Sequence, residues 1–357
     1  MKKVLPTEYP IVTGYPVIAN ALSILQTKEE TTNWILLNLI VPIVMYEEKN
    51  DKLMIDLGGD HTPWNTRYLY DDCPYLTVYR YDRTWFCQQK QDILPFIKWN
   101  IDHEKYIYSD VCEKYIPEYN CDFSDKLHDL FIYGYDEEEK LLFGSDFFYG
   151  EKYRNISISF DDYRKAFDSV EEQGLPHRVE QTTDIMAITH RKLFNSWLAV
   201  DYEDPKCVLP ILKERILECL GKTNVSYMRR YDENLVYGIK GYDLLQKYFQ
   251  DKNFCELKYT YYNRMCIQFL VEHKMVLFKI CNKILKNDCL SNQAKTLFNL
   301  ASIIKGCVLK AMVKQNCSSV ERQSIVNHLN NIKKQELTLL TDMLTFIDEQ
   351  ELYKPLI

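Results

Sequence analysis

The sequence is poor in glycine and proline and lacks the marks of several protein classes. Its 357 residues include 11 Gly and 12 Pro, which excludes collagen-like and low-complexity chains. The formal net charge is −7 and no long basic block is present, so a protein that neutralises many phosphates of a duplex is not expected. The most apolar run, residues 34–45, is too short to span a bilayer and contains Asn38 and Pro42. No signal-peptide pattern follows the first residues (MKKVLPTEYPIVTGYP). We therefore expect a soluble, cytoplasmic protein with no nucleic-acid or membrane partner.

The cysteines and glycines form none of the common cofactor motifs. The 12 Cys are scattered without a C-x-x-C pair, and His103 with Cys112, or His273 with Cys281, lack the spacing of a zinc site. We interpret most of these cysteines as buried free thiols. No Gly-Lys-Ser/Thr follows the Gly58-Gly59 turn, so it is not a phosphate loop. No metal and no bound cofactor are expected.

The two halves of the chain differ in hydrophobic period. Residues 1–170 mix helical segments (19–26, 92–100, 159–170) with strand-like segments (74–81, 106–111) and a β-hairpin. From about residue 185 the apolar spacing is helical, with segments at 189–199, 205–220, 242–250, 257–285, 293–314 and 320–352. The sequence predicts an α+β domain over 1–170 and an α-helical domain over 181–357, joined by a linker at about 171–180.

The hairpin carries the clearest candidate chemistry. Two apolar runs, LHDLFIYGY and KLLFGSDF, flank the turn Asp136–Glu139. His128 and Asp146 are equidistant from this turn, so antiparallel pairing brings them close and their parity allows the same face. A carboxylate beside one imidazole nitrogen fixes the tautomer and supports the imidazolium. The alternative is a strand-end histidine near solvent and an aspartate that caps a turn.

The segment HDLFIYGYDEEEKLLFGSDFF, preceded by YIYSDVCEKYIPEYN and followed by ISISFDDYRKAF, resembles the papain-like cysteine acyltransferases of carrier-protein-dependent biosynthesis. These are the butirosin-type acyltransferases and the closthioamide (polythioamide) amide synthetase, which are distantly similar to bacteriocin-leader cysteine peptidases. The resemblance implies a papain-like N-terminal domain and a Cys-His-Asp triad. It also implies transfer of an acyl or peptidyl group from a carrier-protein thioester to an amine, as in nonribosomal peptide and thioamide antibiotic biosynthesis. The helical half, with Glu272-His273-Lys274 in a long helix, is compatible with it but less diagnostic.

The chain departs from this family at the nucleophile. The family's cysteine opens an N-terminal helix, but the matching helix here, PVIANALSIL from Pro16, contains no cysteine, and the first one in the chain is Cys73. Ala19 is our choice for the nucleophile position, with Pro16 and Val17 as competing registers. Alanine there is either an engineered replacement or a natural loss, and Cys73 or Cys87 is the least favoured substitute.

The resemblance assigns His128 as acid and base and Asp146 as the group that orients it. The oxyanion donor would be the backbone N–H at the helix start, with Asn20 as a side-chain donor. The partners implied are an acyl or peptidyl carrier protein, whose phosphopantetheine arm enters as part of the substrate, and an amine. Two alternatives stay open: a hydrolase with the same triad, and a catalytically dead module that binds a carrier protein.

Overall fold

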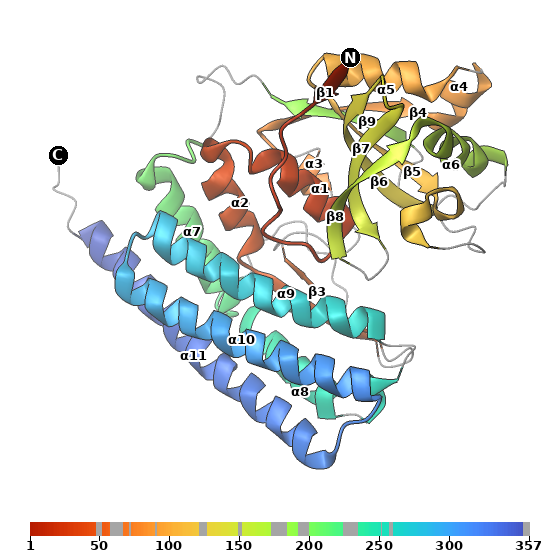
Figure 1. Ribbon diagram of the computed structural model, residues 1–357. Coiled ribbons are helices and arrows are strands. Elements are labelled where there is room, and N and C mark those ends of the chain that lie inside the picture. The colour runs from red at the N-terminus through yellow and green to blue at the C-terminus, as the bar shows by residue number, and fades with distance from the viewer. Residues whose placement is uncertain are drawn as a thin grey trace. The chain divides into compact units, whose positions relative to one another are not determined.

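A computed structural model gives the structure of the chain (Figure 1). It describes residues 1–47, 52–57, 67–70, 73–89, 91–120, 127–148, 152–172, 184–191, 200–223, 235–250, 252–256 and 260–352. The chain divides into two compact units, Met1–Glu29 with Asn65–Leu198, and Glu30–Trp64 with Ala199–Ile357.

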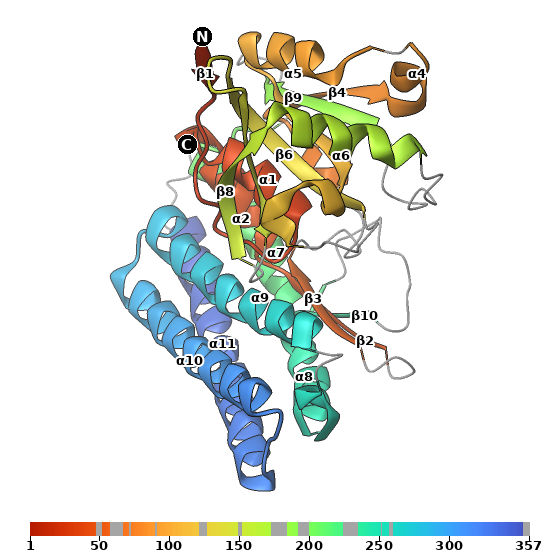
Figure 2. The same ribbon diagram turned by 45° about the vertical axis from the view of Figure 1, so that its right-hand side comes forward.

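The first unit is built on an antiparallel sheet. In spatial order its strands are β4 (Leu76–Asp82), β9 (Asp184–His190), β5 (Tyr106–Cys112), β6 (Leu127–Asp136), β7 (Leu141–Phe148) and β8 (Lys152–Ser159), and β1 (Lys2–Val4) also pairs with β6. The helical segments of this unit are α1 (Pro16–Leu25), α3 (Arg67–Tyr70), α4 (Arg83–Gln88), α5 (Ile93–Asp102), η2 (Glu113–Tyr115), η3 (Pro117–Tyr119) and α6 (Phe160–Glu172). The strands and the helices around them can be followed in Figure 2.

Two helices of this unit start at capping side chains. The Asp92 carboxylate accepts a hydrogen bond from the Leu94 N–H at 3.1 Å, ahead of α5. The Ser159 hydroxyl accepts one from the Asp162 N–H at 3.0 Å, ahead of α6. Each cap satisfies a backbone donor that the first helical turn would leave unpaired.

The second unit is mainly helical, with a small antiparallel sheet in the order β10 (Leu235–Tyr237), β2 (Pro42–Glu47) and β3 (Lys52–Leu57). Its helical segments are α2 (Thr32–Leu39), α7 (Pro205–Cys219), η4 (Gly238–Lys240), α8 (Gly241–Gln250), η5 (Lys252–Cys255), α9 (Thr260–Lys279), a π-helical turn (Ile280–Ile284), α10 (Asp288–Lys314) and α11 (Ser319–Leu352). A short 3₁₀ turn, Glu29–Thr31, leads into α2. Helices α9, α10 and α11 lie side by side (Figure 1).

Apolar residues at helical spacing bury one side of α10. Leu290, Leu297, Ala301, Ile304 and Val308 are all nearly inaccessible to solvent. On length and composition alone, α10 is the one helix among the described residues that could cross a bilayer. It packs against both α9 and α11.

The core of the second unit contains a buried charged cluster, the Lys274–Glu336 cluster, made of Tyr242, His273, Lys274 and Glu336. The Lys274 Nζ donates to Glu336 Oε2 at 2.5 Å and to His273 Nδ1 at 2.7 Å, and His273 Nε2 donates to the Ile40 carbonyl at 2.7 Å. The Tyr242 hydroxyl donates to the same Glu336 oxygen at 2.5 Å. Burial lowers the pKa of His273 to about 4, so the imidazole is neutral and accepts a hydrogen bond from Lys274.

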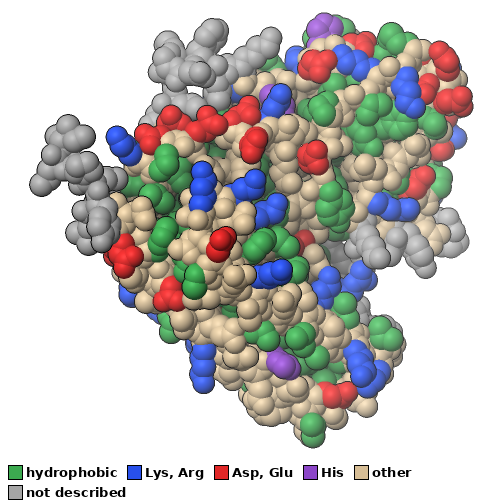
Figure 3. Space-filling view, turned by 60° about the vertical axis from the view of Figure 1, so that its left-hand side comes forward, with side chains coloured by type: hydrophobic (Ala, Val, Ile, Leu, Met, Phe, Trp, Pro, Cys, Tyr) green, Lys and Arg blue, Asp and Glu red, His purple; other side chains and the backbone are tan. Residues whose placement is uncertain are grey.

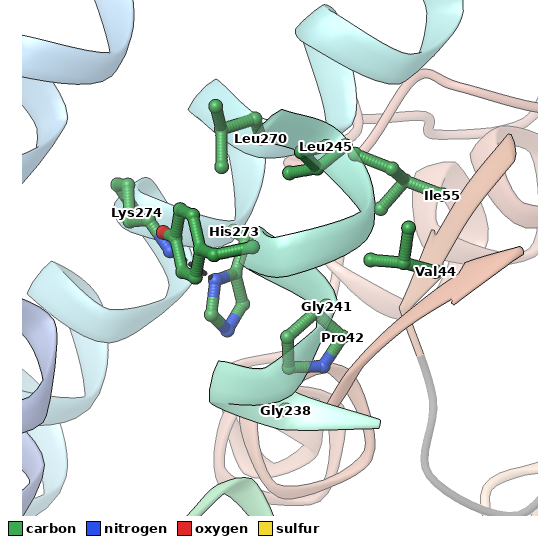
Figure 4. A pocket seen from close by; sticks show the side chains of 10 residues that line it. Pro42, Val44, Ile55, Gly238, Gly241, Leu245, Leu270, His273 and Lys274 are labelled. Atoms are coloured by element: carbon green, nitrogen blue, oxygen red, sulfur yellow. Dashed lines mark hydrogen bonds between the residues drawn. The ribbon is translucent and has the colours of Figure 1, made fainter. Parts of the chain in front are cut away.

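A cavity of about 20 Å³ adjoins this cluster (Figure 4). Side chains from β2, β3, α8 and α9 surround it, including Val44, Ile55, Leu245 and Leu270. A space of this size holds about one water molecule, so we assign no ligand to it.

Gly238 is required by its backbone conformation. Its φ is +64°, and a Cβ there would overlap the backbone of Cys219 at the end of α7. Gly238→Ala is therefore expected to destabilise the second unit by about 1–3 kcal/mol. Gly306→Ala is the control: apart from its neighbours along α10 and the helix backbone, no atom lies within 4 Å of an added Cβ, and the change should stabilise by roughly 0.5–1 kcal/mol. Urea unfolding of both variants measures the difference, and equal stabilities would contradict this account of Gly238.

The structure confirms the α+β class and most of the expected elements, with two differences. Residues 30–64 belong to the second unit, because β2 pairs with both β3 and β10; the expected domain of residues 1–170 placed them in the first. Residues 184–190 form strand β9 in the first unit, where the expected helical domain (181–357) began and a helix was predicted from 189. The Gly58-Gly59 turn, residues 173–180 of the expected linker and residues 192–199 of the helix predicted at 189–199 lie outside the described residues.

Candidate functional site

The β6–β7 hairpin forms as the sequence predicts, with one irregularity. The Asp136 carboxylate accepts hydrogen bonds from the N–H groups of Glu138 and Glu139, at 3.1 and 3.2 Å, and so organises the turn. A bulge between Ile132 and Gly134 shifts the register, so that Phe131 pairs with Ser145. A Cβ at Gly134 would lie 2.8 Å from the Lys3 carbonyl oxygen, and glycine there lets β1 pair beside β6.

His128 and Asp146 meet across this hairpin. In the register of the Phe131–Ser145 pair, Asp146 is level with Leu130, so His128 lies one diagonal step away on the same face. The bulge therefore keeps the two residues from being directly opposite, but they still lie close together on the same face. The His128 Nδ1 lies 2.6 Å from Asp146 Oδ2. The Asp146 side chain is fully buried and that of His128 is 23% exposed, so a buried carboxylate holds an imidazole that solvent can reach.

This carboxylate holds His128 in its charged form. Desolvation lowers the pKa of His128, but the charge and hydrogen bond of Asp146 outweigh it, and Asp129 and Glu113 add to the effect. The resulting pKa of His128 is about 10. The ring is thus an imidazolium at neutral pH, whose Nδ1 is paired with Asp146 Oδ2 and also lies within hydrogen-bond distance, 3.2 Å, of the Asp129 carbonyl oxygen.

Tyr119 is a third member of the site that the sequence did not reveal. Its hydroxyl donates to the same Asp146 Oδ2 that accepts from His128. Its ring centroid lies 5.4 Å from that of His128 and 4.8 Å from that of Phe148. The remaining Asp146 oxygen accepts from the Phe147 N–H at 2.7 Å. In the sequence, Pro117 and Asn120 around Tyr119 are typical of a short turn, and η3 does begin at Pro117 and end at a left-handed Asn120. These residues do not reveal that Tyr119 contacts Asp146 on β7.

Ala19 and Asn20 lie in the first turns of α1 and are both fully buried. The Ala19 N–H is already bonded to the Tyr15 carbonyl at 2.9 Å. Asn20 Oδ1 accepts from the Tyr153 hydroxyl at 2.7 Å, while its Nδ2 has no partner among the described residues. Because Ala19 is fully buried, a substrate could not reach its side chain. Its backbone N–H is also already bonded and is not free to act as an oxyanion donor.

Strand alternation puts α1 and the His128–Asp146 pair on opposite faces of the sheet. Tyr153 pairs with Phe147, and Arg154 pairs with Asp146, so Tyr153 and Asp146 point to opposite sides. Because Asn20 is bonded to Tyr153, α1 lies on the Tyr153 side.

Helix α6 covers the other face. Ser109 pairs with Leu130, on the His128 side, and its hydroxyl bonds the Tyr163 hydroxyl of α6 at 2.9 Å. The structure therefore brings His128 and Asp146 together but does not bring Ala19 or Asn20 to them.

Of the other two candidates for the nucleophile position, Pro16 and Val17, it is Val17 that is connected by side-chain contacts to β6, the strand of His128. Val17 is half-buried at the second position of α1, and its carbonyl accepts from the Tyr70 hydroxyl at 2.7 Å. Tyr70 stacks on Tyr108 at 6.1 Å, and the Tyr108 hydroxyl donates to Asp129 at 2.6 Å. Asp129 follows His128 directly, so these contacts connect the start of α1 to the strand that carries the imidazole.

The substitute nucleophiles are poorly placed. Burial raises the pKa of the Cys73 thiol to about 12, which leaves almost no thiolate at neutral pH. Cys87 is near the end of α4, not at its start. Within the described part of the chain, no three His, Cys, Asp or Glu side chains gather as a metal site.

No protein-family model and no curated protein matches this chain.

Proposed function

We propose that this chain handles an acyl group held as a thioester on a carrier protein, as a papain-like homologue of the amide-forming acyltransferases. One observation carries the proposal: the fully buried Asp146 lies 2.6 Å from the partly exposed His128. A carboxylate buried on one side of an accessible imidazole is the base-and-orienter part of a nucleophilic triad. The antiparallel sheet with a helix on each side supports the papain-like fold that the resemblance implies.

The charge of His128 defines what the site can do. An imidazolium pairs with an anionic thiolate or donates to a carbonyl oxygen that gains negative charge. No thiol is present in α1, so in this chain we assign His128 the second of these roles, in which its Nε2–H binds the thioester carbonyl oxygen. The chain then binds the acyl group without forming an acyl-enzyme at the start of α1.

The proposed partners follow from this chemistry. The acyl donor is a phosphopantetheine thioester on a carrier protein, and the acceptor in the wider family is an amine. Acidic and basic side chains are interspersed on the face shown in Figure 3, which suits a protein partner better than a nucleic acid. Carrier-protein-dependent assembly takes place in the cytoplasm, so we propose that location.

Cysteine scanning at the start of α1 tests the proposal. Val17→Cys and Ala19→Cys are each incubated with an acyl-pantetheine thioester and examined by intact-mass measurement. We expect an acyl adduct on Val17→Cys, because position 17 is half-buried at the helix entry, where the backbone favours a thiolate. We expect none on Ala19→Cys, which is fully buried, and none on the native chain.

A matched control removes the imidazolium. His128→Gln should bind a non-hydrolysable acyl-pantetheine analogue at least tenfold more weakly than the native chain, because the proposed role of His128 is to donate to the carbonyl oxygen of the acyl group. Binding of this analogue that does not depend on His128 would contradict the assigned role. Free acid or amide produced by the native chain would identify a hydrolase or an active transferase and would overturn the binding-only form of the proposal.

A further inference from the structure

Arg154 lies beside the candidate site, on β8, which follows β7 at the end of the sheet. It pairs directly with Asp146 of β7, and residues paired in this way across antiparallel strands project from the same face of the sheet. The Arg154 side chain therefore stands on the face that carries His128 and Asp146. It is exposed to solvent, so a dissolved ligand can reach it.

An aromatic ring holds the guanidinium of Arg154 close to the site. Its Cζ lies 5.4 Å from the centroid of the Phe148 ring, a distance at which the ring attracts a cation. Phe148 is buried, and its ring centroid lies 4.8 Å from that of Tyr119, which in turn lies 5.4 Å from that of His128. Two buried rings thus connect Arg154 to the imidazolium and define where the guanidinium stands.

The positive charge of Arg154 is not used within the site. Asp146, its paired residue, is already bonded through Oδ2 to His128 and to the Tyr119 hydroxyl, and through Oδ1 to the Phe147 N–H. Across the part of the chain that the structure describes, the Arg154 side chain forms no hydrogen bond or ion pair. Its N–H donors are therefore available to an anion from solution.

The spacing of the strands indicates where such an anion lies on the acyl donor. Two strand spacings, about 10 Å, separate the backbones of β6 and β8, and the long side chain of Arg154 spans part of that distance. A short acyl chain can therefore place its carbonyl oxygen at His128 and a terminal anion at Arg154. The phosphate of the pantetheine arm lies beyond the thioester sulfur, at the far end of the arm, and does not fit this spacing.

We propose, on the basis of the proposed function, that Arg154 is a specificity-determining residue that binds the carboxylate of a dicarboxylic acyl chain. One carboxyl group of this chain is joined to the carrier protein as the thioester, and its carbonyl oxygen accepts from His128. The other carboxyl group is free and ionised, and both of its oxygens accept from Arg154. The planar guanidinium offers two parallel N–H donors that match the two carboxylate oxygens.

Two pantetheine analogues that differ in one terminal group test this assignment. In both, an amide replaces the thioester; one carries a glutaryl chain that ends in a carboxylate, and the other carries the matching chain that ends in an uncharged carboxamide. Isothermal titration calorimetry measures their affinity for the full chain. We expect the native chain to bind the carboxylate analogue at least tenfold more tightly than the carboxamide analogue, because hydrogen bonds between charged groups are the stronger ones.

Two variants show whether the preference comes from Arg154 itself. Arg154→Gln should bind both analogues with the affinity that the native chain has for the carboxamide analogue. Arg164→Gln is the matched control, because it removes one arginine of the same unit that is already paired with Asp92, at 2.8 Å. This control should keep the preference, whereas a general effect of net charge would lower it equally in both variants and would overturn the assignment.

The carboxamide analogue separates failure of this assignment from failure of the proposed function. Equal affinity of the native chain for both analogues, with binding that still depends on His128, would overturn the role of Arg154 and leave the acyl-binding role in place. A preference that persists in Arg154→Gln would do the same. If the native chain binds neither analogue, both the proposed function and the role of Arg154 are wrong.

Discussion

Replacing Lys274 with methionine is expected to destabilise the second unit by about 3–5 kcal/mol, because it leaves a buried carboxylate without its cation. Lys274 has no exposed surface, and its Nζ lies 2.5 Å from Glu336 Oε2. In the variant, Glu336 keeps only the Tyr242 hydroxyl as a bonded partner from the Lys274–Glu336 cluster. Urea unfolding followed by circular dichroism measures the loss.

Two further variants distinguish the cost of an unpaired buried charge from the cost of lost packing. Lys274→Met combined with Glu336→Leu removes both charges and should recover most of the lost stability, since apolar replacement of a whole buried ion pair is often neutral or stabilising. Lys333→Met breaks an ion pair with Asp243 that is partly exposed on both sides, and should cost only about 0.2–1 kcal/mol. A Lys274→Met variant as stable as Lys333→Met would show that Glu336 is compensated in another way.

Replacing Asp146 with asparagine is the second large change that we expect. It breaks a buried ion pair by removing one partner, which typically costs about 3–5 kcal/mol. The variant should lose protection from hydrogen exchange in β6 and β7 at neutral pH. His103→Gln is the control, because His103 is exposed at the end of α5 and its replacement should leave that protection unchanged.

The same change should alter how stability depends on pH. The pKa of His128 is raised from 6.5 to about 10 in the folded chain, so folding binds a proton that the unfolded chain releases above its ordinary pKa. The stability from this group is fully present below about pH 6.5 and is lost as pH rises through about 10. Asp146→Asn removes this contribution, so the native-minus-variant difference in stability should shrink as pH rises from about 6.5 to 10. A difference that stays constant from pH 6.5 to 10 would contradict the pairing.

The hairpin could be predicted because the residues that specify it are neighbours in the sequence. Apolar runs of strand length flank an acidic turn, and this places His128 near Asp146 without any tertiary knowledge. The bulge at Ile132–Gly134 was not predictable, because it depends on β1 pairing beside β6 and on Gly134 accommodating the Lys3 carbonyl. Tyr119 was missed for a similar reason, since its contact with Asp146 joins segments 27 residues apart.

The relation of α1 to the site also depends on tertiary structure. Helical spacing predicts that residues 16–25 form a helix, but not which face of the sheet the helix covers. The Asn20–Tyr153 hydrogen bond settles that face, and it lies opposite Asp146. Likewise, residues 34–45 are the most apolar run of the sequence, but only the pairing of β2 with β10 assigns that segment to the second unit.

A titration of the imidazole resonances by nuclear magnetic resonance, in native protein and in Asp146→Asn, tests the central pairing most directly. The account predicts that His128 stays protonated at pH 8 in the native chain and titrates near 10. In the variant its pKa should fall by more than about two units, because desolvation is no longer offset by the carboxylate. A native His128 that titrates near 6.5, unchanged by the substitution, would contradict the ion pair and the acyl-binding role built on it.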